Sequence, residues 1–552
     1  MEYYVNPKLD NFQMSLNSEI FIDKSNLIAK TNAVMRTRQR FVCISRPRRF
    51  GKTMAAEMLA AYYGRGEDAS KLFNDLDIAN HSSYEKHLNK YNVIMINMQE
   101  FLSQTDNAID MLELLRAQVI EELRNSKRSF LTKKFHSLRL KLGSQQNNND
   151  YKDKKSKNKN NIKIFIRLMK DTYRKTKLPF VILIDEWDCV FRARKLNADD
   201  HEIYLDFLRL WFKDQPYIGL AYMTGILPIK KYGDHSAVNM FREYSMTRPG
   251  RFLDYFGFKE EEVIELTSVY KMDMNEMEKW YNGYFADLGT PIYNPTSVSE
   301  CLENKIFSSY WNNTETYEAL KNYIVMDFDG LNNTIMQMIS GYDVAVNPNK
   351  FTNDMFTFNS ADDVLTLLIH LGYLSYNIKE NTIRIPNEEV KSEFINCIED
   401  LNDWGTVVNA IQKSNQLLHA IWNKEENIVA ASVQEVHEQN TSILKYNDEN
   451  SLSCVISLAL YSANNYYTVI RELPTGKGYS DLVFIPRNNH PDKPAMVVEL
   501  KWNKTVGGAI SQIKEKNYLS ALESYQGNLL LVGINYDKET KDHECIIESW
   551  EI

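Results

Sequence analysis

Cysteine is scarce in this chain of 552 residues: there are six, widely separated, and no two form a C-x-x-C pair. This spacing argues against a zinc site and a disulfide framework, and it predicts reduced, mostly buried thiols in the cytoplasm. The longest apolar runs, such as Val181–Ile184, are too short to cross a bilayer, so we expect no membrane contact. The opening MEYYVNPKLDNFQ has no basic region followed by an apolar stretch, so we expect no signal peptide.

An excess of positive charge and several common catalytic motifs are also lacking. The formal net charge of −8 excludes a uniformly basic nucleic-acid-binding protein, although a local basic groove remains compatible with it. The chain has neither G-x-S-x-G nor H-E-x-x-H, and its ten histidines are dispersed, so nothing indicates serine-hydrolase or zinc-protease chemistry. The composition, 43% hydrophobic and 25% charged, is that of a globular protein. At 552 residues the chain is too long for a single hydrophobic core. We expect about three domains.

Short apolar runs separated by helix-like patterns predict an α/β domain in the first part of the chain. The runs have the length of buried strands and lie at 41–45, 93–97, 180–184 and 218–223. The stretch Met54–Tyr63, rich in Ala, Met, Glu and Leu, predicts a helix directly after the first run. Alternation of strand and helix is typical of a parallel sheet covered on both faces.

The stretch SRPRRFGKT, residues 45–53, predicts a phosphate-binding loop. Such loops read G-x-x-x-x-G-K-[ST], and Gly51, Lys52 and Thr53 supply the end of this pattern. Arg46 stands where the first glycine belongs. The backbone N–H groups and the lysine would bind the phosphates of a nucleotide, and the hydroxyl would bind Mg²⁺. A GKT triplet alone is weak evidence, so a second motif is needed.

The second motif is PFVILIDEWD, an apolar run that ends in Asp185 and Glu186. In a Walker B strand the first acid would hold Mg²⁺ and the second would orient the attacking water. A buried strand that ends in two acids also occurs without such a function, but its combination with the GKT loop favours a nucleotide site. Thr224, at the end of the fourth run, could sense the terminal phosphate.

Together with FIDKSNLI before the loop and MTGILPIKKY, WYNGY and IYNPTSV after it, these motifs resemble the AAA-ATPase-like family over roughly residues 1–300. An arginine-rich loop is normal in that family. The resemblance implies an ATPase core of the additional-strand type at 1–290, with ATP and Mg²⁺ as ligands. Arg48 and Arg49 would place charge on the phosphates or form salt bridges within the domain. Three later arginines could supply an arginine finger or form surface salt bridges: Arg242, Arg248 and Arg251.

Two further segments have a distinctive composition or pattern. Residues 144–161, SQQNNNDYKDKKSKNKNN, are polar and aperiodic, which predicts a disordered surface insertion or, alternatively, a nucleic-acid-binding tail. Residues 291–430 are expected to be mainly helical. Within them, 361–395 predicts a helix ending at Gly372, a short hairpin and a second helix, the outline of a winged helix. Such a module contacts DNA or packs as a structural lid.

A second group of charged residues lies near the end of the chain, in GYSDLVFIP and PAMVVELKW. Side chains alternate along a strand, so Glu499 and Lys501 share one face. Pairing of the two strands would bring Asp481 beside Glu499. Two adjacent carboxylates repel each other, and a bound Mg²⁺ would remove the repulsion. A metal-bound water, deprotonated with help from Lys501, could attack a phosphodiester.

The order of strand, hairpin, E-x-K strand, helix and NLLLVGI strand within residues 440–552 resembles the PD-(D/E)XK nuclease superfamily, although the proline of that name is absent. The resemblance implies a nuclease domain with Mg²⁺ on Asp481 and Glu499, and nucleic acid as partner, DNA rather than RNA. Glu449 and Gln512 are candidate accessory residues; otherwise they cap a helix or face solvent.

The sequence therefore predicts an α/β multidomain protein with a P-loop ATPase, a helical and winged-helix-like middle region and a nuclease-like domain. Its predicted function is ATP hydrolysis coupled to Mg²⁺-dependent cleavage of nucleic acid. The alternative is a non-cutting, nucleotide-dependent switch or scaffold that only grips nucleic acid or a partner. A third interpretation is a signalling ATPase of a defence or mobile-element system. Related ATPases commonly form rings, so an oligomer is compatible with the sequence.

Overall fold

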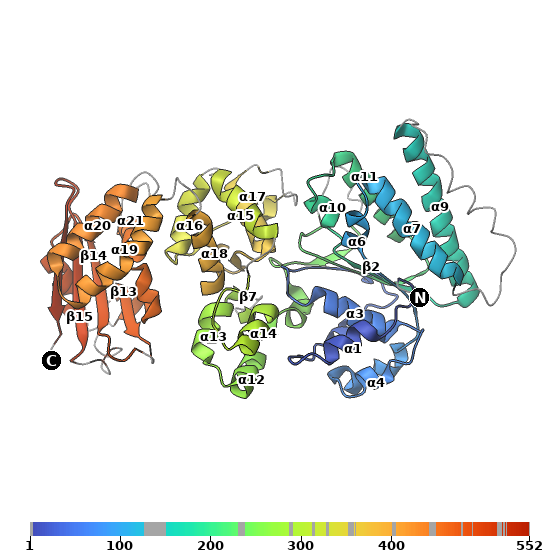
Figure 1. Ribbon diagram of the computed structural model, residues 1–552, viewed down its shortest axis with the longest axis horizontal. Helices are drawn as coiled ribbons and strands as arrows, with labels where there is room; N and C mark the ends of the chain where they lie inside the picture. Colours follow the sequence, from blue (N-terminus) through green and yellow to red (C-terminus); the bar gives the residue numbers. More distant parts are fainter. Residues whose placement is uncertain are drawn as a thin grey trace. The chain divides into compact units, whose positions relative to one another are not determined.

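The computed structural model contains two compact units, Met1–Tyr310 with Ala345–Glu389, and Trp311–Val344 with Val390–Ile552 (Figure 1). In some helices and strands, including parts of 151–159, 449–451 and 471–481, only the backbone is described. The structure describes all residues except 1–3, 126–150, 230–237, 286–290, 312–314, 327–329, 352–357, 359, 400–404, 441–448, 476–477, 488–489, 516–521, 523–524, 526 and 551–552.

A five-stranded sheet forms the centre of the first unit. Its strands lie in the order β2-β3-β4-β1-β5, and neighbouring strands are parallel. The four predicted runs are its first four strands, and β4 lies between the strand of the loop and the Walker B strand, as the additional-strand type requires. The strands are β1 (Phe41–Ser45), β2 (Asn92–Asn97), β3 (Phe180–Asp185), β4 (Ile218–Gly225) and β5 (Arg242–Tyr244).

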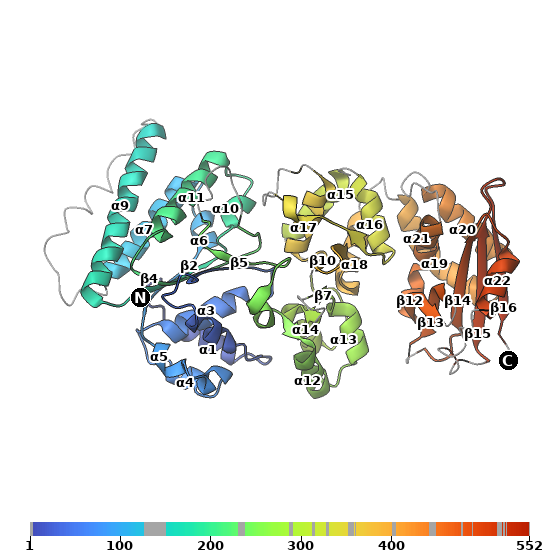
Figure 2. The same ribbon diagram turned by 180° about the vertical axis from the view of Figure 1, so that it is seen from behind.

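Helices cover both faces of this sheet (Figures 1 and 2). One face carries α1 (Asp10–Leu16) and α3 (Lys52–Tyr63), and α3 packs on β2, β3 and β4. Much of α3 is buried, because its small and apolar residues contact the strands directly. The other face carries α6 (Met98–Ser103), α7 (Ala108–Asn125), α9 (Tyr151–Thr176), α10 (Cys189–Arg192) and α11 (Ala198–Phe212).

Residues 151–161, the second part of the insertion predicted to be disordered at 144–161, are helical. Residues 144–150 lie outside the described residues, whereas 151–161 belong to α9. The disorder prediction is therefore corrected for 151–161. Ile162, Phe165 and Met169 anchor the following turns in the core, and extending an existing helix is far less costly than nucleating one.

The predicted helix and hairpin belong to the first unit, and the helix predicted after them passes into the second unit at Val390. α17 (Ala361–Leu371) ends at Gly372, whose φ of +90° suits a glycine cap. β10 (Ser375–Asn377) pairs antiparallel with β11 (Thr382–Arg384), and α18 (Glu388–Glu399) follows. DNA contact by this segment stays a prediction. A small sheet in the order β6-β8-β7 also lies in the first unit, with the strands β6 (Phe258–Lys259), β7 (Tyr284–Phe285) and β8 (Pro291–Tyr293). The unit also contains the helices α12 (Glu260–Tyr270), α13 (Met274–Tyr281) and α14 (Pro295–Asn304).

The second unit contains a mixed sheet in the order β12-β13-β14-β15-β16, in which only β14 and β15 are parallel. The strands are β12 (Tyr467–Thr475), β13 (Gly478–Pro486), β14 (Ala495–Trp502), β15 (Leu529–Tyr536) and β16 (His543–Ser549). α22 (Val506–Glu515) connects the parallel pair and packs on it. The other helices are α15 (Glu315–Met326), α16 (Leu331–Ile339), α19 (Gly405–Trp422), α20 (Glu426–Asn440) and α21 (Glu449–Ala459).

The middle region is helical, as predicted, but its residues are divided between the two units. The domain boundaries at 290, 430 and 440 therefore stay predictions. All six cysteines are buried and unpaired, in agreement with the expected reduced thiols. In the part of the chain that the structure describes, no helix has the length and apolar character needed to span a membrane.

Candidate functional site

The predicted phosphate-binding loop lies between β1 and α3. Gly51 is the N-cap of α3 and has a φ of +79°, a conformation that favours glycine. A Cβ atom at this position would meet no atom within 4 Å, so the loop borders open space. Arg49 also has a positive φ, of +68°. The turn that replaces the usual glycine-rich loop therefore still exposes the N-terminus of α3, where backbone N–H groups bind anions.

Lys52 is buried within this loop and is only 5% exposed. Its Nζ atom donates a hydrogen bond of 2.7 Å to the carbonyl oxygen of Pro47. Burial lowers the pKa of Lys52, while the carboxylates of Glu186 and Asp185 oppose that shift. The ammonium group is thus held at the loop by a backbone oxygen that a phosphate oxygen could replace.

Asp185 connects the loop, the Walker B strand and β4. Its Oδ2 atom accepts a hydrogen bond of 2.6 Å from Thr53, and its Oδ1 atom accepts one from Thr224. The three residues come from α3, β3 and β4, and all were predicted as site residues. A hydroxyl and a carboxylate in direct contact are oxygen donors of the kind that Mg²⁺ prefers, so this group fits the metal.

Glu186 lies beside this group and lines the same pocket as Lys52. Burial raises the pKa of its carboxyl group, and the guanidinium of Arg192, which donates a hydrogen bond to it, opposes the shift. Arg192 also pairs with Asp188, at 3.2 Å. Asp188 in turn accepts hydrogen bonds of 3.1 and 2.8 Å from the backbone after β4. Sequence reasoning missed these two residues, although their i,i+4 spacing after the Walker B strand was a usable signal.

The arginines of the loop have different environments. Arg46 is buried and donates 2.9 Å hydrogen bonds to the carbonyls of Ser45 and Tyr244, so it holds the loop to β5. Arg48 and Arg49 line the pocket. The guanidinium of Arg49 also donates to the carbonyl of Tyr310. Of the suggested finger residues none lines this pocket: Arg248 contacts Asn349 at 3.1 Å, Arg251 lies over Phe252 with 5.2 Å to the ring centroid, and Arg242 is exposed.

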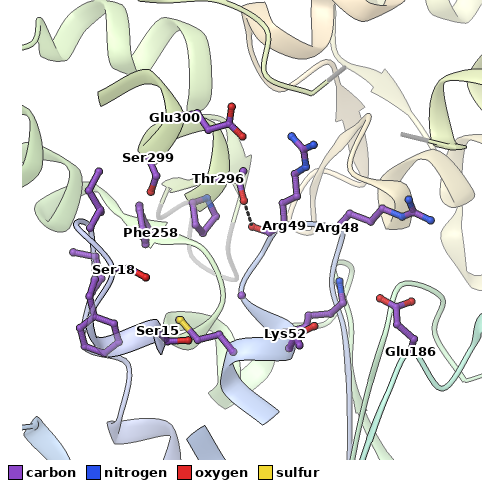
Figure 3. A pocket seen from close by; sticks show the side chains of 17 residues that line it. Ser15, Ser18, Arg48, Arg49, Lys52, Glu186, Phe258, Thr296, Ser299 and Glu300 are labelled. Atoms are coloured by element: carbon purple, nitrogen blue, oxygen red, sulfur yellow. Dashed lines mark hydrogen bonds between the residues drawn. The ribbon is translucent and has the colours of Figure 1, made fainter. Parts of the chain in front are cut away.

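The pocket has a volume of about 610 Å³, a size that suits a nucleotide. Figure 3 shows Lys52, Arg48 and Glu186 on one side of it, and Phe258, Thr296 and Ser299 across from them. The first turn of α14 forms part of this second wall, and Thr296 donates a 3.4 Å hydrogen bond to the carbonyl of Arg49. Sequence reasoning named no residue of this wall. The signal was the Asn-Pro pair of IYNPTSV, because Asn294 caps α14 and a proline follows.

In the second unit, β13 and β14 pair as the sequence predicted. Leu482 lies opposite Val498, and one further step along this antiparallel register places Asp481 opposite Glu499. The side chain of Asp481 lies outside the described part. Glu499 and Lys501 share one face of β14, and Lys501 Nζ lies 2.9 Å from Glu499 Oε1.

Two further residues were predicted beside Glu499. Gln512 of α22 donates a hydrogen bond to the same Oε1 atom that Lys501 contacts, so the structure brings Gln512 into this group. Glu449 is the first residue of α21, which packs against β14, but its side chain lies outside the described part. Among the described residues no cluster of three or more acidic, His or Cys side chains could hold a metal. Of the two predicted metal ligands, the structure describes the side chain of Glu499 and the register position of Asp481.

Family models match both parts of the chain. Residues 9–233 match the model described as "Predicted AAA-ATPase". Residues 447–546 match the model described as "PD-(D/E)XK nuclease superfamily". The chain joins an AAA-ATPase-like domain to a PD-(D/E)XK nuclease superfamily domain. Both resemblances stated from the motifs are thereby confirmed.

Similar solved structures include the Walker-type ATPase PABY2304 of Pyrococcus abyssi. It is 13% identical with a TM-score of 0.33, and the similarity covers 67% of this chain and 94% of that one. Another is the Aeropyrum pernix ORC2 protein in ADPNP–ADP complexes, 9% identical with a TM-score of 0.27, covering 71% of this chain and 93% of that one. No curated protein matches the chain.

Proposed function

We propose that the AAA-ATPase-like domain binds and hydrolyses ATP with Mg²⁺ and that the C-terminal domain is a Mg²⁺-dependent nuclease. The observation that carries the nuclease half is the pair Glu499 and Lys501, which are 1% and 6% exposed with their charges 2.9 Å apart. Removing a charged pair from water costs free energy that the attraction does not fully return. A catalytic use of the pair accounts for its place in this strand better than stability does.

In the ATP site, the loop would hold the phosphates and the neighbouring acid would hold the metal. Lys52 would exchange the carbonyl of Pro47 for a phosphate oxygen, and Arg48 and Arg49 would add positive charge. Thr53 and Asp185 would hold Mg²⁺, which when bound neutralises charge on the phosphates. The hydrogen bond that joins these two residues supports their shared role.

Two other residues would act on hydrolysis itself. Glu186 would orient and accept a proton from the attacking water, a use that its raised pKa supports because a stronger base is a better proton acceptor. Thr224 would sense the terminal phosphate through Asp185, to which it already donates a hydrogen bond.

In the nuclease site, Asp481 and Glu499 would hold Mg²⁺. When bound there, the metal supplies positive charge against the phosphodiester and lowers the pKa of a water. Lys501 would stabilise the charge that develops on the phosphate, since its ammonium is fixed beside Glu499. Gln512 would orient the Glu499 carboxylate, and Glu449 is the proposed accessory acid. The proposed substrate is nucleic acid, DNA rather than RNA, in the cytoplasm, and assembly into an oligomer is compatible with the proposal.

Coupling between the two activities would pass through Arg49. Its guanidinium donates to the carbonyl of Tyr310, the last residue before the chain enters the second unit. The N–H group of Tyr310 donates a 2.8 Å hydrogen bond to Glu389, the last residue before the chain enters that unit again. A phosphate that draws Arg49 away would break its hydrogen bond to Tyr310. Arg49→Ala should leave cleavage present but no longer changed by ATP.

The second candidate is the non-cutting switch. One observation favours it: a single oxygen of Glu499 accepts hydrogen bonds from both Lys501 and Gln512, so protein groups already occupy this oxygen and Lys501 balances its charge. A domain of this kind would bind nucleic acid without cleaving it. Binding and cleavage assays on the same protein separate the two candidates.

The experiment is an incubation of the purified protein with end-labelled single- and double-stranded DNA and RNA. Each substrate is tested with and without Mg²⁺ and with and without ATP, and ATP hydrolysis is followed in parallel. Shortened products that require Mg²⁺ and disappear in Lys501→Ala support the nuclease. Nucleic acid that is bound but stays full length under every condition contradicts cleavage and supports the switch.

A further inference from the structure

The helix α9 has a charge unlike that of the rest of the chain. Its 26 residues include ten Lys or Arg and two Asp, a net charge of +8, whereas the whole chain carries −8. The remaining residues therefore carry −16. Such an asymmetry between segments points to a polyanionic partner when the positive residues gather on an exposed surface.

One face of α9 fixes the helix to the first unit. Ile162, Phe165 and Met169 are buried at the spacing i, i+3, i+7. The ring of Phe165 lies 5.4 Å from that of Trp211 and 6.2 Å from that of Phe207, both on α11. Because these contacts hold the helix by its apolar side, its orientation in the domain is set independently of its charges.

A second stripe, turned away from the buried face, is basic. Lys163, Arg167, Lys170 and Arg174 follow at i, i+4, i+7 and i+11, the spacing of one face of a helix. The side chains of Arg167 and Arg174 are 86% and 74% exposed. The sequence continues the same spacing toward the start of α9 with Lys159, Lys155 and Lys152. At a rise of about 1.5 Å per residue, the stripe from Lys163 to Arg174 is roughly 17 Å long.

Little of this charge is neutralised within the helix. Asp171 lies 3.4 Å from Arg174 and 4.0 Å from Arg167, and its side chain is 42% exposed. Ion pairs this exposed contribute little free energy and exchange easily with solvent or ligand. Both guanidinium groups can therefore leave Asp171 for a phosphate at small cost.

We infer that this basic stripe of α9 binds the phosphate backbone of nucleic acid. Its length is about half of the roughly 34 Å turn of a DNA duplex, and a row of cations binds phosphates without reading bases. A membrane surface would require large apolar side chains among the cations, and Ile164 is the one exposed large apolar side chain of α9 in its described part. The inference rests on the proposed function, since it gives the nuclease a second, non-catalytic hold on the same polymer.

The test variant replaces the four described residues together: Lys163→Gln, Arg167→Gln, Lys170→Gln and Arg174→Gln. Glutamine keeps helix propensity while it removes the charge. A matched control replaces four exposed lysines of the same unit outside α9 with glutamine: Lys8, Lys30, Lys71 and Lys86. Binding of a labelled duplex DNA is measured by anisotropy without Mg²⁺ across a salt series, so that cleavage does not interfere.

We expect the stripe variant to bind about tenfold more weakly or worse, with a salt slope of log K smaller by about 3, while the control and wild type agree. ATP hydrolysis should not change, because no replaced residue lines the pocket. If the stripe variant bound DNA with the affinity and salt slope of wild type, the inference would be overturned. The same holds if the stripe variant lost binding to anionic vesicles while its DNA binding stayed intact. Failure of the proposed nuclease looks different: wild-type protein would bind DNA through the stripe without cutting it.

Discussion

At the scale of single residues, the account depends on polar groups that the fold holds in contact without solvent. Asp185 is the best example, because it accepts hydrogen bonds from Thr53 and Thr224 while it is 1% exposed. Its carboxylate thereby links three elements at the end of the sheet. Lys52 is buried at the same place, and the nearest carboxylates, those of Asp185 and Glu186, compensate its charge in part.

The first prediction concerns Lys52. Lys52→Ala should weaken ATP binding at least roughly tenfold, since a charge-assisted hydrogen bond contributes about 1.5–3 kcal/mol. The fold should persist, because alanine keeps the helix propensity of this position and the lost hydrogen bond ends on a backbone oxygen. Isothermal titration with ATP and Mg²⁺ measures the effect, and Lys71→Ala, an exposed site on the small helix Ser70–Phe73, serves as control. Equal affinities of Lys52→Ala and wild type would show that the loop assignment is wrong.

The second prediction concerns pH. Burial raises the pKa of Glu186, and Arg192 lowers it. Hydrolysis needs the ionised carboxylate, so activity should be lost as pH falls through this pKa. Removing the guanidinium should raise the pKa further, so the acid limb of the kcat profile should move to higher pH in Arg192→Gln. Arg192→Lys keeps the charge and should shift it less. An acid limb that stays at the wild-type position in Arg192→Gln would contradict the role of Glu186.

At the scale of helices and strands, local sequence patterns predict where an element lies, whereas its contacts with distant elements depend on the fold. The strands 41–45 and 180–184 were predictable because each is a short apolar run, the first between two arginines and the second between a proline and an acid. The shared face of Glu499 and Lys501 followed from the period-two alternation of a strand. Gln512 could be placed only as a candidate, since its contact with Glu499 depends on how α22 crosses from β14 to β15.

Other features depend on contacts between residues far apart in sequence. Thr296, which lines the pocket beside the loop, lies 247 positions after Arg49, and no local pattern indicates that pairing. Arg46 could have contacted phosphate or protein, and the position of Tyr244 decided for protein. Residues 151–161 have the composition of a disordered segment, yet the apolar anchor that follows them makes them helical.

The third prediction concerns that anchor. Phe165→Ala should lower the free energy of unfolding of the first unit by about 3–5 kcal/mol, because it removes a fully buried ring that contacts Trp211. Ile164 is its neighbour on the same helix but is 45% exposed, so Ile164→Ala should cost about 1 kcal/mol or less. Urea unfolding followed by circular dichroism measures both. Similar losses for the two variants would show that α9 is not anchored through Phe165.

At the scale of the whole molecule, each unit contains a buried histidine that stays neutral. Burial lowers the pKa of His370 to about 3 in the first unit and that of His543 to about 3 in the second. The unfolded chain binds a proton at each near pH 6.5, whereas the folded chain does not until about pH 3. The contribution of these two histidines to the free energy of unfolding is therefore fully present above pH 6.5 and is lost as the pH decreases toward 3.

The fourth prediction follows from this linkage. Between pH 6.5 and 5.5, His370 alone should reduce the stability of the first unit by about 1 kcal/mol, as a pH unit corresponds to about 1.4 kcal/mol for a fully titrating group. His370→Phe should flatten this dependence, because phenylalanine does not titrate. The new ring can keep the stacking on Phe351, which lies 5.9 Å away between centroids. Denaturant unfolding at several pH values measures it, with the exposed His81→Gln as control. If the stability of His370→Phe depended on pH as steeply as that of wild type, His370 would be excluded as the source of the pH dependence.

The central claim is that one chain performs two hydrolytic reactions at two separate sites, and a pair of variants tests it most directly. ATP hydrolysis and Mg²⁺-dependent cleavage of labelled DNA are measured side by side for wild type, Lys52→Ala and Glu499→Gln. The account predicts that Lys52→Ala loses ATP hydrolysis and the response of cleavage to ATP, whereas Glu499→Gln loses cleavage and keeps ATP hydrolysis. Cleavage that persists undiminished in Glu499→Gln, or its absence from wild type on every substrate, would contradict it.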